Sequence, residues 1–155
     1  MNDIESISRQ NCTGCMMCGD LCPKQAISFP ISRADSFWYP VIDHEKCINC
    51  GKCYQRCPST LILASEKAEP IVCYGAKSRN EEVRANSTSG GVFSELAYKW
   101  IGQGGVCVGA EYDLNQRIFH AIEKDDAGVK RLRQSKYAQS DTSQIYLRTK
   151  KALTI

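Results

Sequence analysis

Eight of the ten cysteines fall in two runs that share one spacing. Each run reads C-x2-C-x2-C-x3-C-P, and the second begins 35 residues after the first. The members of the two runs are Cys12, Cys15, Cys18 and Cys22, then Cys47, Cys50, Cys53 and Cys57. This spacing is typical of chains that hold two 4Fe–4S clusters, in which the fourth cysteine of each run ligates the other cluster. The sequence therefore predicts electron transfer through two clusters.

The crossed pattern assigns four thiolates to each cluster, which matches the preference of iron–sulfur clusters for soft ligands. One cluster is expected on Cys12, Cys15, Cys18 and Cys57, and the other on Cys47, Cys50, Cys53 and Cys22. Pro23 and Pro58 prevent each run from continuing as a helix. Because each cluster draws on both runs, we expect neither half of this region to fold properly without the other.

Two other uses of cysteine compete with this interpretation. Zinc sites also contain C-x2-C pairs, but they need four ligands in two pairs rather than two runs of four. A disulfide framework requires a secreted chain, and the first residues have neither a basic start nor an apolar signal core. Thiolates that bind clusters favour a reducing compartment, so we expect a cytoplasmic location.

Composition narrows the class of protein further. The chain has 155 residues, 43% of them hydrophobic, and no apolar stretch long enough to span a bilayer. A basic run at Lys130, Arg131 and Arg133, with Lys136 close by, either faces phosphates or an acidic redox partner or is solvated surface. No aromatic residues interleave a basic stripe, so we expect no binding to nucleic acid.

The predicted fold class is α+β, with two domains. Residues 1–66 are expected to form a bacterial-ferredoxin-like domain in which strands at 26–29 and 38–43 make a hairpin between the cysteine runs, with a helical tail at 59–67. Residues 70–155 alternate strands and helices, as in a small α/β domain. Its expected strands are 71–76, 106–112 and 118–122, and its expected helices are 80–85, 90–101, 125–133 and 143–153. Because three strands make a thin core, we expect this domain to be incomplete by itself, and further chain or a partner to complete its core.

A polar turn precedes the amphipathic helix expected at 90–101. Its residues are Ser87, Thr88, Ser89, Gly90 and Gly91. Exposed N–H groups at a helix start, with hydroxyls beside them, suit the phosphate of a flavin. The alternative is a plain serine N-cap followed by glycines for clearance. Cys73 and Cys107 lie in apolar runs outside the ligand spacing, and we expect both to be buried small hydrophobes.

Several short segments resemble one family in their order. They are the two cysteine runs, Tyr39-Pro-Val-Ile-Asp43 between them, the turn at 87–93, and the segments 104–109 and 132–137. Together they resemble the beta subunits of coenzyme F-420 (deazaflavin)-reducing hydrogenase and dehydrogenase. The resemblance implies a flavin, usually FAD, beside the clusters, and a further domain that helps to enclose it. Lys136 and Tyr137 are candidates to contact the flavin phosphate and ring, and the alternative for this pair is surface and core edge.

Three hypotheses of function remain open. The first is an iron–sulfur electron-transfer module of a flavin-dependent oxidoreductase, with a redox protein or subunit and a flavin or deazaflavin as partners. The second is a ferredoxin-like carrier without catalysis, whose second domain only docks partners. The third makes the second domain a scaffold in a larger complex.

Overall fold

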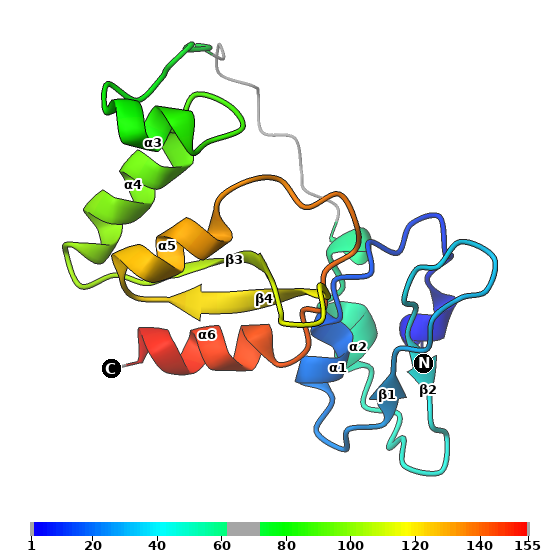
Figure 1. Cartoon of the computed structure of the whole chain (residues 1–155). Helices are drawn as coiled ribbons and strands as arrows, with labels where there is room; N and C mark the ends of the chain where they lie inside the picture. The colour runs from blue at the N-terminus through cyan, green and yellow to red at the C-terminus, as the bar shows by residue number, and fades with distance from the viewer. Residues whose placement is uncertain (1, 62–71, 155) are drawn as a thin grey trace. The chain divides into compact units, whose positions relative to one another are not determined.

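The chain forms two compact units, shown in Figure 1. The computed structural model describes residues 2–61 and 72–154. The first unit comprises Met1–Ala64 together with Asp141–Lys151, and the second comprises Ser65–Ser140 with Ala152–Ile155. Residues 141–151, which the sequence analysis placed in the second domain, therefore belong to the first unit. The junction between the two expected domains, at residues 66–70, lies outside the described residues.

A short hairpin separates the two cysteine runs in the first unit, as the sequence predicts. Strand β1 (Ile27–Ser28) pairs antiparallel with β2 (Val41–Ile42), and Ile27 lies opposite Ile42. An isolated bridge between Ile31 and Trp38 extends the pairing toward the loop. The hairpin directs Ile42 into the core while Val41 stays exposed.

Short helices surround this hairpin. They are the 3-10 helix η1 (Ile4–Ser6), α1 (Met17–Leu21), α2 (Lys52–Gln55) and the 3-10 helix η2 (Pro58–Thr60). Ile4, Cys18 and Ile42 form the buried core, so a cysteine side chain takes a place usually filled by an aliphatic one. The helical tail expected at 59–67 is represented by η2, and residues 62–67 lie outside the described part of the chain.

The second unit contains three of the helices predicted from the sequence. They are α3 (Glu81–Ala85), α4 (Val92–Ile101) and α5 (Asp126–Leu132). Side chains cap two of them, because Asn80 Oδ1 accepts from the Val83 N–H at 3.2 Å and Asp125 Oδ1 accepts from the Gly128 N–H at 2.8 Å. These caps satisfy backbone donors that a helix start leaves free.

The sheet of the second unit is smaller than expected. Strands β3 (Cys107–Tyr112) and β4 (Ile118–Glu123) form an antiparallel pair, with Gly109 opposite Ala121. The third strand, expected at 71–76, is absent over 72–76, and Ile71 lies outside the described residues. Val72 and Tyr74 are 67% and 87% exposed, and Cys73 is exposed rather than buried. An apolar pattern forms a strand only where a neighbouring strand offers its backbone groups, and none does so here.

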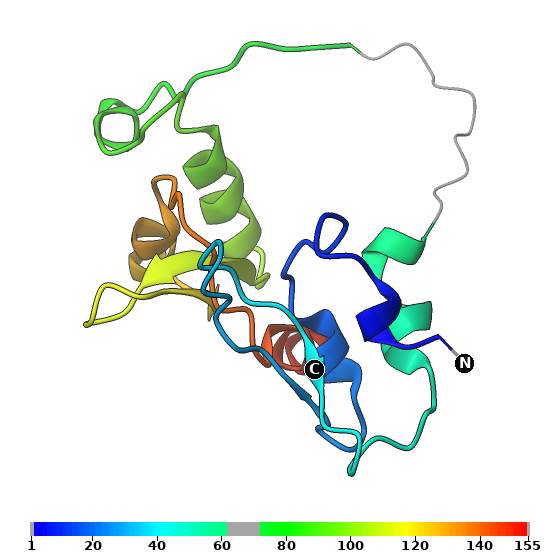
Figure 2. The ribbon, with the colours of Figure 1, turned by 90° about the vertical axis from the view of Figure 1, so that its right-hand side faces the viewer.

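Helices α4 and α5 pack on the same side of the β3–β4 hairpin (Figures 1 and 2). The core between them includes Val129 and Leu132 from α5, Ala121 from β4 and Ala97 from α4. A two-stranded hairpin is marginal by itself, so these helices supply most of the apolar surface that it buries. Within the described residues, no helix has the length and apolar character needed to cross a membrane.

Candidate functional site

The two cysteine runs adopt the same backbone twice. Gly14 and Asn49, which occupy equivalent positions, have φ angles of 64° and 53°. Met16 and Gly51, also equivalent, have φ angles of 58° and 69° and lie just before α1 and α2. Left-handed residues reverse the chain sharply, and only one position of each pair carries the glycine that adopts this conformation without steric cost. The repeated turn curls three cysteines of each run around a common space.

The first of these spaces is a pocket lined by four cysteines, and they come from both runs. They are Cys12, Cys15, Cys18 and Cys57. Apolar side chains complete the wall, among them Ile4, Phe29 and Pro40. The structure thus brings together the four thiols that the crossed pattern assigns to one cluster.

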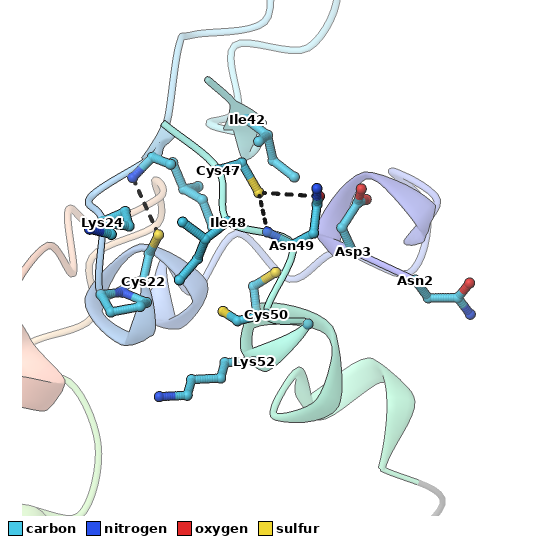
Figure 3. A pocket seen from close by; sticks show the side chains of 15 residues that line it. Asn2, Asp3, Cys22, Lys24, Ile42, Cys47, Ile48, Asn49, Cys50 and Lys52 are labelled. Carbon is cyan, nitrogen blue, oxygen red and sulfur yellow. Dashed lines mark hydrogen bonds between the residues drawn. The ribbon is translucent and has the colours of Figure 1, made fainter. Parts of the chain in front are cut away.

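The second pocket holds the reciprocal set and is shown in Figure 3. Its cysteines are Cys22, Cys47, Cys50 and Cys53. Two sulfurs already accept backbone hydrogen bonds, from Ala26 N to Cys22 Sγ at 3.3 Å and from Asn49 N to Cys47 Sγ at 3.5 Å. Hydrogen bonds to ligand sulfurs are among the features that tune a bound cluster.

Burial raises the pKa of two of these thiols. Burial, and next the neighbouring Cys15, raise the pKa of Cys18 to about 12. Burial also raises the pKa of Cys53. Four thiolates in one apolar pocket repel one another, so they need a cationic core between them. Among the described residues no three His, Cys, Asp or Glu side chains are arranged to hold a single metal ion. Four thiolates drawn from both runs match the soft ligands that a multinuclear cluster takes.

A segment more than 120 residues away in sequence packs on the first cysteine run. Thr142 Oγ1 donates to the Cys15 carbonyl oxygen at 2.7 Å. The Asp20 carboxylate accepts from the Gln144 N–H at 2.8 Å and from the Tyr146 N–H at 3.0 Å. Asp20 thereby caps the start of α6 (Ile145–Leu153), whose red ribbon lies beside α1 in Figures 1 and 2. The sequence analysis missed this contact, because no local pattern links Asp20 to a helix so far along the chain.

Tyr146 places a phenol next to the first pocket. Burial, and after it the Cys15 thiol, raise the pKa of Tyr146 to about 12, and its side chain hydrogen-bonds to Cys15. The phenol therefore remains protonated at neutral pH and can donate to the cysteine sulfur. Hydrogen bonds to ligand sulfurs are among the features that set the reduction potential of a cluster.

The polar turn of the second unit also lines a pocket. Its five residues at 87–91 share this pocket with Arg133 and Gln134. Lys136 lies in a neighbouring pocket with Lys130, while Tyr137 is 94% exposed and lines neither. The structure thus gathers the turn but separates it from Lys136 and Tyr137, which were expected to act with it.

Lys136 is already engaged by backbone oxygens. Its Nζ donates to the carbonyls of Arg131 at 3.1 Å and Arg133 at 2.6 Å, at the end of α5. A cation at a helix C-terminus satisfies free carbonyls there and interacts favourably with the helix dipole. Burial lowers the pKa of Lys136. These contacts fit a structural role for Lys136, like the alternative of surface and core edge that the sequence left open.

No side chain caps the start of α4. The residue before the helix is Gly91, with a φ of +79° and no capping hydrogen bond from a side chain. Ser87 Oγ donates instead to the Val83 carbonyl at 2.6 Å. The plain serine N-cap considered from the sequence is therefore wrong. Gly90 is needed for clearance, since a Cβ at this position would overlap the Ala76 carbonyl oxygen.

Comparisons with known proteins support an iron–sulfur region in this chain. Two models described as 4Fe-4S dicluster domain match, one over residues 11–61 and the other over residues 39–111. The chain is 37% identical over 57 residues to an uncharacterized ferredoxin of Methanocaldococcus jannaschii, an alignment that covers 37% of this chain and 71% of the ferredoxin.

A second relative is a much longer protein. The chain is 38% identical over 64 residues to one component of the Na(+)-translocating ferredoxin:NAD(+) oxidoreductase complex of Acetobacterium woodii. The alignment covers 41% of this chain but only 18% of that component. With two pockets of four cysteines and a ferredoxin relative of which it covers more than two thirds, the chain belongs to the 4Fe-4S dicluster ferredoxins and is an iron–sulfur electron-transfer protein.

Proposed function

We propose that this chain is the iron–sulfur module of a flavin-dependent oxidoreductase and passes electrons through two 4Fe–4S clusters to or from a flavin. The observation that carries the proposal is the pair of pockets, each lined by three cysteines of one run and one of the other. Cys57 would complete the cluster held by the first run, and Cys22 the cluster held by the second. A shared framework of this kind holds the two clusters at a fixed separation, as electron transfer between them requires.

The chain's own residues control how each cluster is exposed and tuned. Ile4 and Phe29 keep water from the first pocket, and Ile27 and Ile42 line the second. Backbone N–H groups at Ala26 and Asn49 donate to ligand sulfurs of the second pocket, while Tyr146 reaches a ligand sulfur of the first. Such bonds stabilise the more negative, reduced state and raise the potential. When bound, the clusters supply one-electron transfer.

The flavin part of the proposal is supported by the second unit. The turn at 87–91 lines a pocket at the uncapped start of α4, and its sequence contributes to the resemblance to the deazaflavin hydrogenase beta subunits. A flavin, usually FAD in that family, exchanges single electrons with clusters and pairs of electrons with a substrate. The redox partner would be a protein or subunit that receives or delivers these electrons in the cytoplasm.

A cofactor count on one anaerobic preparation tests the proposal. We expect about eight iron and eight sulfide per chain, since each of two clusters contributes four of each, together with flavin. A preparation that binds only one zinc ion would refute the cluster assignment. A preparation with full iron but no flavin, after incubation with FAD, would refute the oxidoreductase part alone.

The second hypothesis, a ferredoxin-like carrier, also has a specific observation in its favour. The matched Methanocaldococcus jannaschii ferredoxin aligns over 57 residues, which is 71% of its length, so a protein little larger than the first unit exists as a ferredoxin. A carrier would exchange electrons with a partner enzyme while showing no flavin and no turnover. Flavin content in the cluster-loaded protein therefore separates the two hypotheses.

A further inference from the structure

Arg133 is a buried cation, and no residue that the structure describes gives it an acidic partner. Arg133 is 8% exposed. Its guanidinium donates to two neutral hydroxyls, from Nε to Ser94 Oγ at 3.0 Å and from Nη2 to the Tyr98 hydroxyl at 2.5 Å. It also lies over the Tyr98 ring, with 5.6 Å from Cζ to the ring centroid. In the described part of the chain no carboxylate pairs with Arg133. A buried charge is costly unless a counter-charge compensates it.

The neighbouring arginine shows what compensation looks like in this unit. Arg131 donates to Glu111 at 3.2 Å and to Glu123 at 2.7 Å, so both of these carboxylates are already paired. Glu95, on the same helix as Ser94, accepts from the Ser78 hydroxyl. Glu82 lines the adjacent pocket together with Lys130 and Arg133, but it forms no ion pair with Arg133 within the described residues. The chain thus neutralises the exposed arginine and leaves the buried one bonded only to neutral groups.

The two hydroxyl contacts occupy Nε and Nη2 of Arg133 and leave Nη1 without a partner among the described residues. Every buried side-chain nitrogen or oxygen described has a hydrogen-bond partner, so Nη1 is not enclosed by protein. Arg133 lines the pocket that the turn at 87–91 also lines. Arg133 lines the adjacent pocket as well, so its guanidinium borders both pockets and can reach a ligand in the pocket of the turn.

The start of α4 adds backbone donors to the same pocket. Val92, Phe93 and Ser94 line it, and no side chain caps their N–H groups. Helix α4 has ten residues, and its macrodipole places partial positive charge at this end. A helix start and a guanidinium are both used in proteins to bind phosphate oxygens.

We propose that Arg133 and the uncapped start of α4 form a binding site for a phosphate group, with Arg133 supplying the charge. The hydroxyls of Ser87, Thr88 and Ser89 line the rim of this site. The inference deepens the proposed flavin function, on which it rests for the identity of the ligand, by naming the residue that would hold the flavin phosphate. The anion site itself is independent of cluster binding.

Inorganic pyrophosphate is the first probe, because it carries the phosphate chemistry of FAD without the flavin ring. Binding to the cluster-loaded full chain would be measured by calorimetry for the unaltered protein and for Arg133→Gln. We expect the affinity of the variant for pyrophosphate to be lower by about tenfold or more, since hydrogen bonds to charged groups are the strong ones. Arg131→Gln is the matched control, because that side chain is exposed and paired with Glu111 and Glu123, and it should bind pyrophosphate as the unaltered chain does.

A second variant tests the site without touching Arg133. Thr88→Glu places a carboxylate on the exposed part of the turn, within the same pocket. The new carboxylate should compete with pyrophosphate and lower the affinity of the chain for pyrophosphate roughly tenfold. It should also raise the unfolding midpoint of this unit, because the buried cation gains a partner. Gln103→Glu, at the other end of α4, makes the same charge change and should do neither.

Four outcomes decide between the anion site and its flavin ligand. Undiminished pyrophosphate affinity in both Arg133→Gln and Thr88→Glu, or no pyrophosphate binding to the unaltered chain, would overturn the site. FAD that binds more tightly than pyrophosphate and loses affinity in Arg133→Gln, while riboflavin does not, would support both the site and the flavin function. FAD that binds no more tightly than pyrophosphate would leave the anion site supported and contradict the flavin function.

Discussion

The cysteine pockets and the pocket at 87–91 differ in how their residues are brought together. In the first unit the ligands are set by a short repeated turn, and the equivalent residues Met16 and Gly51 take nearly the same conformation. In the second unit the turn is local, but the charge facing it comes from Arg133, which lies 42 residues beyond Gly91. A site built from repeated local geometry can be identified from spacing alone. A site completed by a distant side chain that belongs to no repeated motif cannot.

The largest expected effect breaks the cysteine pockets. Cys57→Ser should remove roughly half of the iron, because the pocket of Cys12, Cys15 and Cys18 loses its fourth thiolate. Iron and sulfide analysis, with electron paramagnetic resonance of the reduced protein, would measure the loss. Cys73→Ser is the matched control, since Cys73 is exposed and lines neither cysteine pocket. Selective damage to the cluster of Cys47, Cys50 and Cys53 would contradict the crossed ligand sets.

A smaller effect disrupts the pocket at 87–91. Gly90→Ala should destabilise the second unit by about 1–3 kcal/mol, because the added Cβ overlaps the Ala76 carbonyl and overpacked sites shift the backbone. Denaturant unfolding would measure the change, and pyrophosphate affinity should fall with it. Gly75→Ala adds the same methyl group where no atom lies within 4 Å, so it should leave both unchanged. Equal loss of iron and of anion binding in Gly90→Ala would show that the two sites are not independent.

The next effect concerns the contact between the first cysteine run and residues 141–151. Asp20→Ala removes the acceptor of the Gln144 and Tyr146 N–H groups and should cost about 1–2 kcal/mol, the usual cost of a lost N-cap. Faster hydrogen exchange at these two amides would report the release of α6. Asp35→Ala, the same change in an exposed loop of the same unit, should leave their exchange rates unaltered.

The smallest effect is a pH dependence in the β3–β4 hairpin. Burial lowers the pKa of His120, whose Nδ1 lies 2.8 Å from Ser140 Oγ. The imidazole is therefore protonated more readily in the unfolded chain. The stability that it contributes is complete above the ordinary histidine pKa of about 6.5 and is lost as the pH falls below that value.

Substitution of this histidine provides the measurement. His120→Gln should reduce the acceleration of amide exchange in β3 and β4 between neutral and mildly acidic pH. His44→Gln is the control, because His44 lies in the first unit, 3.3 Å from Glu5. An unchanged pH profile in His120→Gln would assign the acid sensitivity to another group.

The sequence by itself determined the cysteine pockets, the hairpin between them and most helices of the second unit. The hairpin and the helices depend on residues close in the chain, where capping side chains and apolar periodicity act directly. The cysteine pockets follow from a repeated spacing that implies an exchange of the fourth ligand between the two runs. The same local patterns failed at 72–76, where an apolar run remains exposed because none of the described strands pairs with it.

Apart from the crossed cysteines, only the tertiary structure decided which distant groups join each site. It placed Asp20 at the start of α6, Tyr146 beside Cys15, and Arg133 beside the turn at 87–91. It also separated Lys136 and Tyr137 from that turn, although they follow Arg133 closely in sequence. Contacts of this kind depend on packing between elements far apart in the chain. Spacing along the sequence does not specify which side chains of these elements point toward one another.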